Sequence, residues 1–275
     1  MVNPVLTEAA IAPFLETRWL GRELHCFDVL DSTNSTAREL AAAGAADGAV
    51  VIADAQRRGR GRLGRAWVSP AGRNLYVSIV LRSAVPPERL AQVSLLAGVA
   101  TCETARAWCP DAAIKWPNDV LAGGRKTAGI LCEMDLGGAT PVVVAGIGVN
   151  LNSAAGDFPE ELRDKATSLR LAGGAPVDRA RFTGALLTRL EACVDRWRQD
   201  GFAPIATAWR ALAPLLGRRI HVQEPGGAVT GTAIDLDDDG ALRIRRDDGS
   251  EHRVVAGDVT VVGGYEQRAT TDEHR

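Results

Sequence analysis

The sequence lacks long hydrophobic runs and has almost no excess of charge of either sign. Nowhere do about eighteen apolar residues follow one another, so no transmembrane helix is expected. The first residues show no positively charged start before an apolar stretch, so no secretory signal is expected. The 32 lysines and arginines nearly balance the 34 aspartates and glutamates, whereas general nucleic-acid binders carry many uncompensated cations. These absences predict a cytoplasmic protein that binds neither membranes nor DNA.

Motifs for metals, disulfides and Walker-type phosphate loops are also missing. The five cysteines include no C-x-x-C pair and the four histidines are scattered, so neither a zinc site nor a disulfide framework is expected. An odd number of unpaired thiols is typical of reduced, buried side chains. No G-x-x-x-x-G-K-[ST] sequence is present.

The composition is that of an ordinary globular protein, with 46% hydrophobic and 24% charged residues, in one large or two smaller domains. A hairpin is expected at 119–136, turning at Gly123 and Gly124, and a loop at 152–169. Hydrophobic periodicity predicts helices at 31–44, 87–109, 182–197 and 203–213, and further strands at 48–56, 74–82, 112–116 and 141–152.

The pattern changes after Pro214. Short strand-like runs separated by Gly and Asp turns fill residues 215–264 and predict a small β-barrel. We therefore expect an α/β domain at 1–214, the barrel at 215–264 and a disordered polar tail at 265–275.

The segment QRRGRGRLGR (56–65), called the arginine loop below, places five arginines and three glycines in a loop between two predicted strands. Glycine lets backbone amides approach an anion closely, and guanidinium groups bind carboxylate or phosphate as fixed forks. The composition therefore indicates an anion-binding loop. A solvated basic loop or an RGG-type nucleic-acid segment explains it equally well.

A second cluster, KWPND (115–119), is followed by Lys126 and Gly129. The proline forces an extended bend, after which Asn118 and Asp119 can point into a cleft. Lys126 lies on an arm of the predicted hairpin, and Gly129 could let a ligand touch the backbone. Taken alone, the cluster is explained somewhat better as an Asx turn with a surface lysine.

Two further motifs are ambiguous. DSTN (31–34) offers hydroxyl and amide groups to a small polar ligand, but capping of the following helix is the simpler interpretation. GIGVN (146–150) lacks the third glycine and the following helix of a dinucleotide fingerprint. A strand that simply ends explains it better.

The four motifs occur in the order DSTN, QRRGRGRLGR, KWPND and GIGVN. In this order and spacing they resemble the biotin protein ligases, which attach biotin to biotin-dependent carboxylases. The likeness covers residues 28 to about 262. It implies a mixed β-sheet catalytic domain of the biotin/lipoate ligase type, α/β in class, followed by an SH3-like β-barrel. It also implies a biotin–[biotin carboxyl carrier protein] ligase that uses ATP and Mg²⁺ to form biotinyl-5′-AMP and pyrophosphate, then transfers biotin to a lysine ε-amine. The partner would be the carrier domain of acetyl-CoA carboxylase or a related carboxylase.

The resemblance also implies roles for individual residues. Lys126 would stabilise the transition state between the biotin carboxylate and the α-phosphate, and Arg62 would restrain release of the adenylate beneath a closing loop. Asp119 would act in catalysis and hold Mg²⁺, while Arg57 and Arg58 receive no role. The biotin site would comprise Ser32, Thr33, Asn34, Gln56, Gly59, Arg60, Gly61, Arg62, Lys126 and Gly129. The ATP and adenylate site would comprise Arg60, Arg62, Arg65, Trp67, Asn118, Lys126 and Asn150, beside the loop 152–168.

Two kinds of alternative remain. Members of the family that also repress transcription carry a winged helix-turn-helix domain before DSTN, whereas roughly thirty residues precede it here, so we expect a ligase-only protein, as a monomer or homodimer. Lipoate ligases and octanoyl transferases share the fold but lack the paired arginine-loop and KWPND motifs, and the transferases need a cysteine nucleophile. A nucleic-acid-binding module that uses the arginine loop is disfavoured by the acidic balance.

Overall fold

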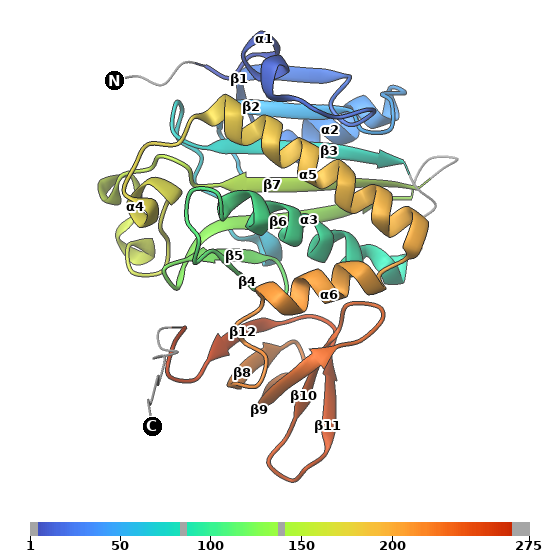
Figure 1. The fold of residues 1–275 in the computed structure, drawn as a ribbon, viewed down its shortest axis with the longest axis vertical. Helices are drawn as coiled ribbons and strands as arrows, with labels where there is room; N and C mark the ends of the chain where they lie inside the picture. Colours follow the sequence, from blue (N-terminus) through green and yellow to red (C-terminus); the bar gives the residue numbers. More distant parts are fainter. Residues whose placement is uncertain (1–4, 83–86, 137–140, 266–275) are drawn as a thin grey trace, which may run out of the picture.

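The computed structural model describes residues 5–82, 87–136 and 141–265, so the predicted tail lies outside the described residues except for Tyr265. Helices cover both faces of a large sheet, and a smaller sheet formed by the C-terminal residues lies at one end of it (Figure 1). None of the described helices is long and apolar enough to cross a membrane.

The large sheet has seven strands in the order β1-β2-β3-β7-β6-β5-β4. The first two are parallel because a helix, α2 (Thr33–Ala42), connects them, while every other neighbouring pair is antiparallel. The sequence analysis gave no bounds for β1, whose residues are partly buried or exposed. The strands are β1 (Leu24–Leu30), β2 (Val50–Gln56), β3 (Leu75–Arg82), β4 (Ala113–Lys115), β5 (Asp119–Ala122), β6 (Arg125–Asp135) and β7 (Val142–Val149).

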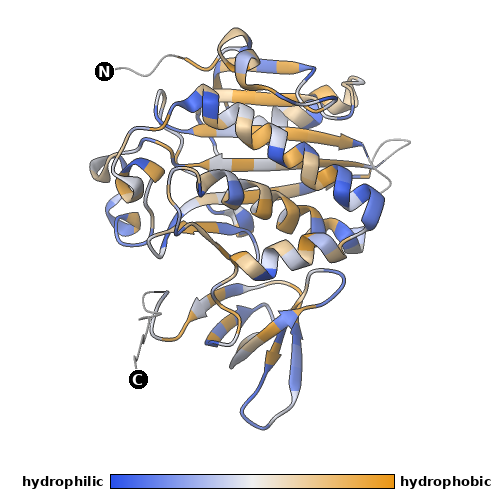
Figure 2. Cartoon of the chain, viewed as in Figure 1, coloured by the Kyte–Doolittle hydropathy of each residue, from blue (hydrophilic) through white to orange (hydrophobic). Residues whose placement is uncertain are grey.

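Alternation along β7 divides the core between the two faces of the sheet. Val142 and Val144 pack with α2 on one face, whereas Val143 and Ala145 belong to the larger core on the other. Polar residues follow the outer side of α5, and hydrophobic residues fill the strands (Figure 2). The helices over the larger core are α3 (Leu90–Ala105), α5 (Arg179–Asp200) and α6 (Ala203–Leu212).

The predicted hairpin and loop are confirmed. Gly123 and Gly124 have positive φ angles of 53° and 71°, which a tight turn between β5 and β6 requires. The stretch after β7 contains only short turns of 3₁₀-helix before a one-turn helix. The remaining short elements are α1 (Glu8–Ile11), η1 (Ala12–Phe14), η2 (Arg62–Gly64), η3 (Pro87–Arg89), η4 (Ala155–Asp157), η5 (Glu160–Leu162) and α4 (Leu169–Gly173).

The C-terminal part is a separate antiparallel sheet in the order β11-β10-β9-β8-β12, which agrees with the predicted all-β unit. Its first strand shows why: Ile220 and Val222 are buried, while Arg219, His221 and Gln223 are exposed. The strands are β8 (Arg219–Glu224), β9 (Gly227–Leu236), β10 (Leu242–Arg245), β11 (Glu251–Val254) and β12 (Asp258–Val261).

The turn between β9 and β10 fastens this small sheet to the large part. The Trp116 indole N–H, in the KWPND motif, donates to the carbonyl oxygen of Gly240 at 3.1 Å. Gln92 on α3 donates to the carbonyl oxygen of Asp238 at 2.6 Å. Gly240 has a positive φ of 91°, which favours glycine, and a Cβ there would lie 2.7 Å from the end of the Leu95 side chain. The small sheet is therefore docked directly behind a predicted site motif.

Candidate active site

A cavity of about 290 Å³ opens between the arginine loop, the KWPND turn, the loop after β7 and the start of β12. Among the predicted site residues, only Gly59 does not line it. A Cβ on Gly59 would lie 2.4 Å from the carbonyl oxygen of Trp67, so this glycine lets the two arms of the loop pack together. The cavity brings together Ser32, Thr33, Asn34, Gln56, Arg60, Gly61, Arg62, Arg65, Trp67, Asn118, Asp119, Lys126, Gly129 and Asn150.

One end of the cavity is formed by uncharged hydrogen-bonding side chains. The buried Ser78 hydroxyl lies 2.6 Å from Asn34 Oδ1 and 2.8 Å from Thr33 Oγ1. Gln56 Nε2 donates to Ser69 Oγ at 2.9 Å. Because these groups hold one another in place, they form a fixed surface that suits a polar but uncharged ring.

The N-terminus of α2 is capped from outside the helix. Ser32 is the N-cap residue, but its side chain makes no capping hydrogen bond. Gln56 Oε1 instead accepts from the backbone N–H of Thr33 at 2.9 Å. The interpretation of DSTN as a capping sequence is therefore wrong, because the side chain of Ser32 does not cap the helix and Ser32, Thr33 and Asn34 line the cavity.

Glu133 connects this end of the cavity to the arginine loop. Its carboxylate accepts from Asn34 Nδ2 at 2.7 Å and from both terminal nitrogens of Arg60, at 2.9 and 2.7 Å. Such a two-pronged pair fixes the plane of the guanidinium group. The sequence analysis missed Glu133, since nothing in the β6 sequence distinguishes it from other charged residues on a half-exposed strand.

Two other arginines of the loop reach across the cavity. Arg62 donates to Asn118 Oδ1 at 2.9 Å, and Arg65 pairs with Asp258 at the start of β12. Burial lowers the pKa of the Arg62 guanidinium, so an anion in the cavity would offset the cost of holding this charge away from water. Arg58 instead pairs with Asp31 and does not line the cavity.

Lys126 is held as a fixed positive charge beside the open space. Its Nζ lies 2.6 Å from Asp119 Oδ1 and 5.4 Å from the centre of the Trp67 ring. Its backbone is also fastened, because its N–H donates to Lys165 and its carbonyl accepts from Thr167, both at 2.9 Å. The loop after β7 therefore sets the position of this lysine.

The glycines of GIGVN lie inside β7, and two cavity side chains pack directly against them. A Cβ on Gly146 would lie 2.1 Å from Asn34 Oδ1, and one on Gly148 would lie 2.5 Å from the Trp67 indole. The strand does end within this motif, at Val149, but its two glycines also make room for cavity side chains. The buried Trp67 indole N–H has no acceptor within the described part of the chain.

Asn150 follows β7 and donates to the carbonyl oxygen of Thr167 at 3.1 Å, so it joins the two ends of the next loop. The loop 152–168, which the resemblance placed beside the adenylate, lines the cavity through Ser153, Asp157, Phe158 and Lys165. Sequence reasoning missed Asn74, Tyr76 and Asp258, because they lie in stretches that carry no motif.

A buried ion pair supports the floor of the cavity. Arg179 on α5 lies 2.5 Å from Asp54 on β2, and both side chains are almost fully buried. Asp54 accepts from the N–H of Gly72, and Arg179 donates to the carbonyl oxygen of Asn74. Removing one partner would leave the other as an uncompensated buried charge, which is costly. Through these hydrogen bonds the pair fixes Gly72 and Asn74, in the segment that follows the arginine loop.

Comparisons with known proteins agree with the fold and site. The model of the biotin/lipoate A/B protein ligase family matches residues 26–150, and that of the biotin protein ligase C terminal domain matches 215–262. A biotin–[acetyl-CoA-carboxylase] ligase of Mycobacterium tuberculosis is 40% identical, covering 84% of this chain and 87% of its own. The bifunctional ligase/repressor BirA of Bacillus subtilis is 39% identical, covering 89% and 76%.

A solved structure is also similar. The biotin protein ligase from Aquifex aeolicus in complex with biotin and ATP has a TM-score of 0.76 and 27% identity, covering 88% of this chain and 99% of that chain. These comparisons place the chain in the class of biotin/lipoate protein ligases. Within that class, the chain belongs to the biotin protein ligase family, which confirms the resemblance read from the sequence.

We expect Gly148→Ala to displace the Trp67 ring, because the added methyl group has no room between β7 and the indole. Overpacking of this kind should lower the free energy of unfolding by about 1–3 kcal/mol and weaken biotin and ATP binding together. Chemical denaturation and calorimetric titration measure the two effects. Gly156→Ala is the control, since nothing lies within 4 Å of its added Cβ; equal stability of the two variants would contradict the expectation.

Proposed function

We propose that this protein activates biotin with ATP and transfers the biotinyl group to one lysine of a carrier domain. A single observation carries the proposal. One cavity joins an uncharged hydrogen-bonding end, around Asn34, to a cationic end formed by Lys126, Arg62 and Arg65. Biotin has a neutral ureido ring at one end and a carboxylate at the other, and the carboxylate must meet the phosphates of ATP.

In the first step, the biotin carboxylate attacks the α-phosphate and pyrophosphate leaves. Two anions must approach each other, so the enzyme has to place positive charge between them. Lys126 is suited to this task, because Asp119 and the Trp67 ring hold its ammonium group beside the cavity. It acts as a point charge.

In the second step, the lysine ε-amine of the acceptor attacks the mixed anhydride and AMP leaves. Until then, water must be kept away from the reactive adenylate. Arg62 and its partner Asn118 span the cavity and are placed to close over it. Asp119 is the carboxylate beside Lys126 and is placed to orient the incoming amine.

The residues of the site are compatible with Mg²⁺ that arrives with ATP. No group of three or more potential metal ligands of the His, Cys, Asp or Glu type occurs within the described ranges. Magnesium in nucleotide sites is usually bound through one or two carboxylates together with substrate phosphates and water. Asp119 would supply such a carboxylate, and the ion would neutralise charge on the phosphates.

A cysteine-dependent transferase is not favoured. Burial raises the pKa of all five cysteine thiols, to about 12 for Cys102 and Cys132. A reactive thiol needs a lowered pKa, because the thiolate is the nucleophile. Lipoate ligation is not favoured either, since the relatives described above are named as biotin ligases.

The remaining assignments follow from this function. We propose residues 1–214 as the catalytic domain, 215–264 as the small β-domain, and the carrier domain of acetyl-CoA carboxylase or a related carboxylase as the partner. A cytoplasmic location is consistent with the use of ATP and with five cysteines that form no disulfide.

The proposal is tested by incubating the protein with biotin, MgATP and a biotin carboxyl carrier domain. We expect biotin-dependent pyrophosphate release and, by mass spectrometry, one biotinyl group on one lysine of the carrier. Lipoate and octanoate serve as competing acids. Preferential activation of either would refute the assignment to biotin.

A further inference from the structure

The arginine loop is joined to the small β-domain by one ion pair. Arg65, four residues C-terminal to Gly61, pairs with Asp258 at the start of β12. Both side chains are substantially exposed, at 65% and 42%, and both residues line the cavity. The small domain therefore contributes a carboxylate to the active site.

Asp258 is held in place by a firmly docked domain. Its strand pairs with β8, where Asp258 lies opposite Gln223. The domain is fixed to the catalytic part by the Trp116–Gly240 and Gln92–Asp238 hydrogen bonds. When Arg65 moves, Asp258 is therefore expected to stay at the mouth of the cavity.

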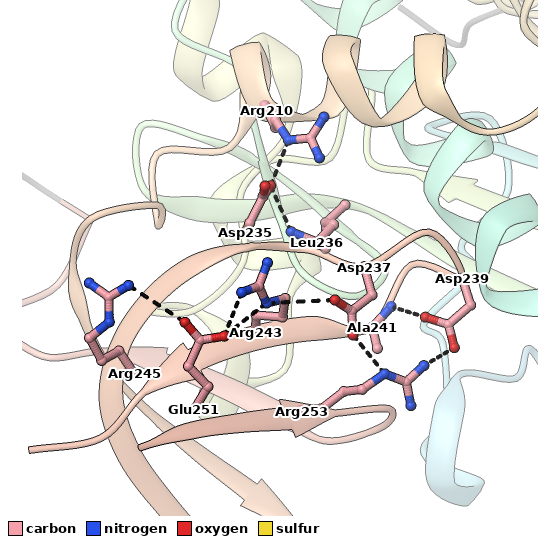
Figure 3. Close-up of polar contacts among 10 residues, drawn as sticks. All are labelled: Arg210, Asp235, Leu236, Asp237, Asp239, Ala241, Arg243, Arg245, Glu251 and Arg253. Carbon is pink, nitrogen blue, oxygen red and sulfur yellow. Dashed lines mark hydrogen bonds and ion pairs between the residues drawn. The ribbon is translucent and has the colours of Figure 1, made fainter. Parts of the chain in front are cut away.

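A second ion pair links the same two parts away from the cavity. Arg210 on α6 reaches Asp235 on β9 at 2.6 Å (Figure 3). Its side chains are 39% and 36% exposed, so it resembles the Arg65 pair in type and exposure. Neither residue lines the cavity, which makes Asp235 a matched control for Asp258.

Two other cations of the cavity are also paired with carboxylates, whereas Arg62 bonds to the amide oxygen of Asn118. Arg60 pairs with Glu133, and Lys126 pairs with Asp119, whose side chains are 22% and 17% exposed. The carboxylate that pairs with Arg65 is more exposed, and exposed pairs contribute little net free energy. Phosphates carry more negative charge than a carboxylate. Phosphates that enter the cavity should therefore displace Asp258 from Arg65 before they displace Glu133 from Arg60 or Asp119 from Lys126.

We propose that Asp258, in the small domain, is a positioning residue. Its carboxylate holds Arg65 at the mouth of the cavity until the phosphates of ATP take the place of that carboxylate. The proposal rests on the ATP-dependent function above. Asp258 and the phosphates compete for one guanidinium group. Loss of the carboxylate therefore strengthens ATP binding, whereas loss of a purely structural contact would weaken it.

The test is calorimetric titration of the full-length protein with MgATP, without biotin, so that no turnover occurs. Asp258→Asn should lower the Kd for MgATP about two- to fivefold, the range of an exposed ion pair. Asp235→Asn should leave it unchanged, and neither variant should change the Kd for biotin. Thermal unfolding verifies that both variants are folded.

A double-mutant cycle separates exchange at Arg65 from a general effect of charge. In an Arg65→Gln background, Asp258→Asn should no longer tighten MgATP binding. Tightening that persists without Arg65, or a folded Asp258→Asn protein with unchanged or weaker binding, would overturn the proposal. Failure of the wild-type protein to bind MgATP would instead overturn the proposed function.

Discussion

Lys126→Ala is expected to reduce biotin-dependent pyrophosphate release about a hundred- to a thousandfold, while the protein stays folded. This is the range observed when one preorganised group that stabilises transition-state charge is removed. The ammonium group is fixed between Asp119 and Trp67, so no other group can take its position without rearrangement. Steady-state pyrophosphate release measures the loss, and circular dichroism verifies the fold.

Arg125→Ala is the matched control for this variant. Arg125 precedes Lys126 on β6, but its side chain is exposed and does not line the cavity. Its release rate should stay within about twofold of wild type, as for surface substitutions generally. Near-normal release by a folded Lys126→Ala protein would refute the role assigned to this lysine.

Arg62→Gly is expected to release biotinyl-adenylate about ten- to a hundredfold faster than wild type. Hydrogen bonds made by a charged group contribute about 1.5–3 kcal/mol, which corresponds to this range. The guanidinium lines the cavity and bonds to Asn118, so its removal takes a charged group from beside the site proposed for the adenylate. Escaped adenylate should label lysines of a bystander protein such as albumin, detected by an avidin blot.

Arg58→Gly controls for the added flexibility of a glycine in the same loop. Arg58 pairs with Asp31 outside the cavity, so this variant should retain the adenylate as wild type does. Equal labelling by both variants would mean that loop flexibility, and not the Arg62 guanidinium, controls retention. No labelling above wild type by Arg62→Gly would count against its role in retention.

Most helices and strands could be predicted because local patterns encode them. The β-branched run before Gln56 and the alternation at 74–82 predicted the strands on either side of the arginine loop, and both are present. Glycines at 123 and 124 predicted a turn because positive φ angles favour that residue. The sequence analysis gave no bounds for β1, whose residues are all partly buried or exposed.

The site residues came from a resemblance of motifs, and the structure shows that all but Gly59 line one cavity. Residues outside the motifs could not be found in this way. Arg65 and Asp258 are 193 residues apart, and no local pattern connects them. Glu133 and Ser78 become recognisable only when β6 and β3 are placed beside α2, because their role depends on the partners that they meet there.

The sequence by itself determined the identity of the charged groups, the loop that carries the arginines and the family. These depend on neighbouring residues along the chain, whose spacing is fixed by covalent geometry. Only the tertiary structure decided which carboxylate faces which cation, and why Gly146 and Gly148 must lack a side chain. Those features depend on distances of a few ångströms between segments far apart in sequence, which arise only when the sheet and the small domain have packed together.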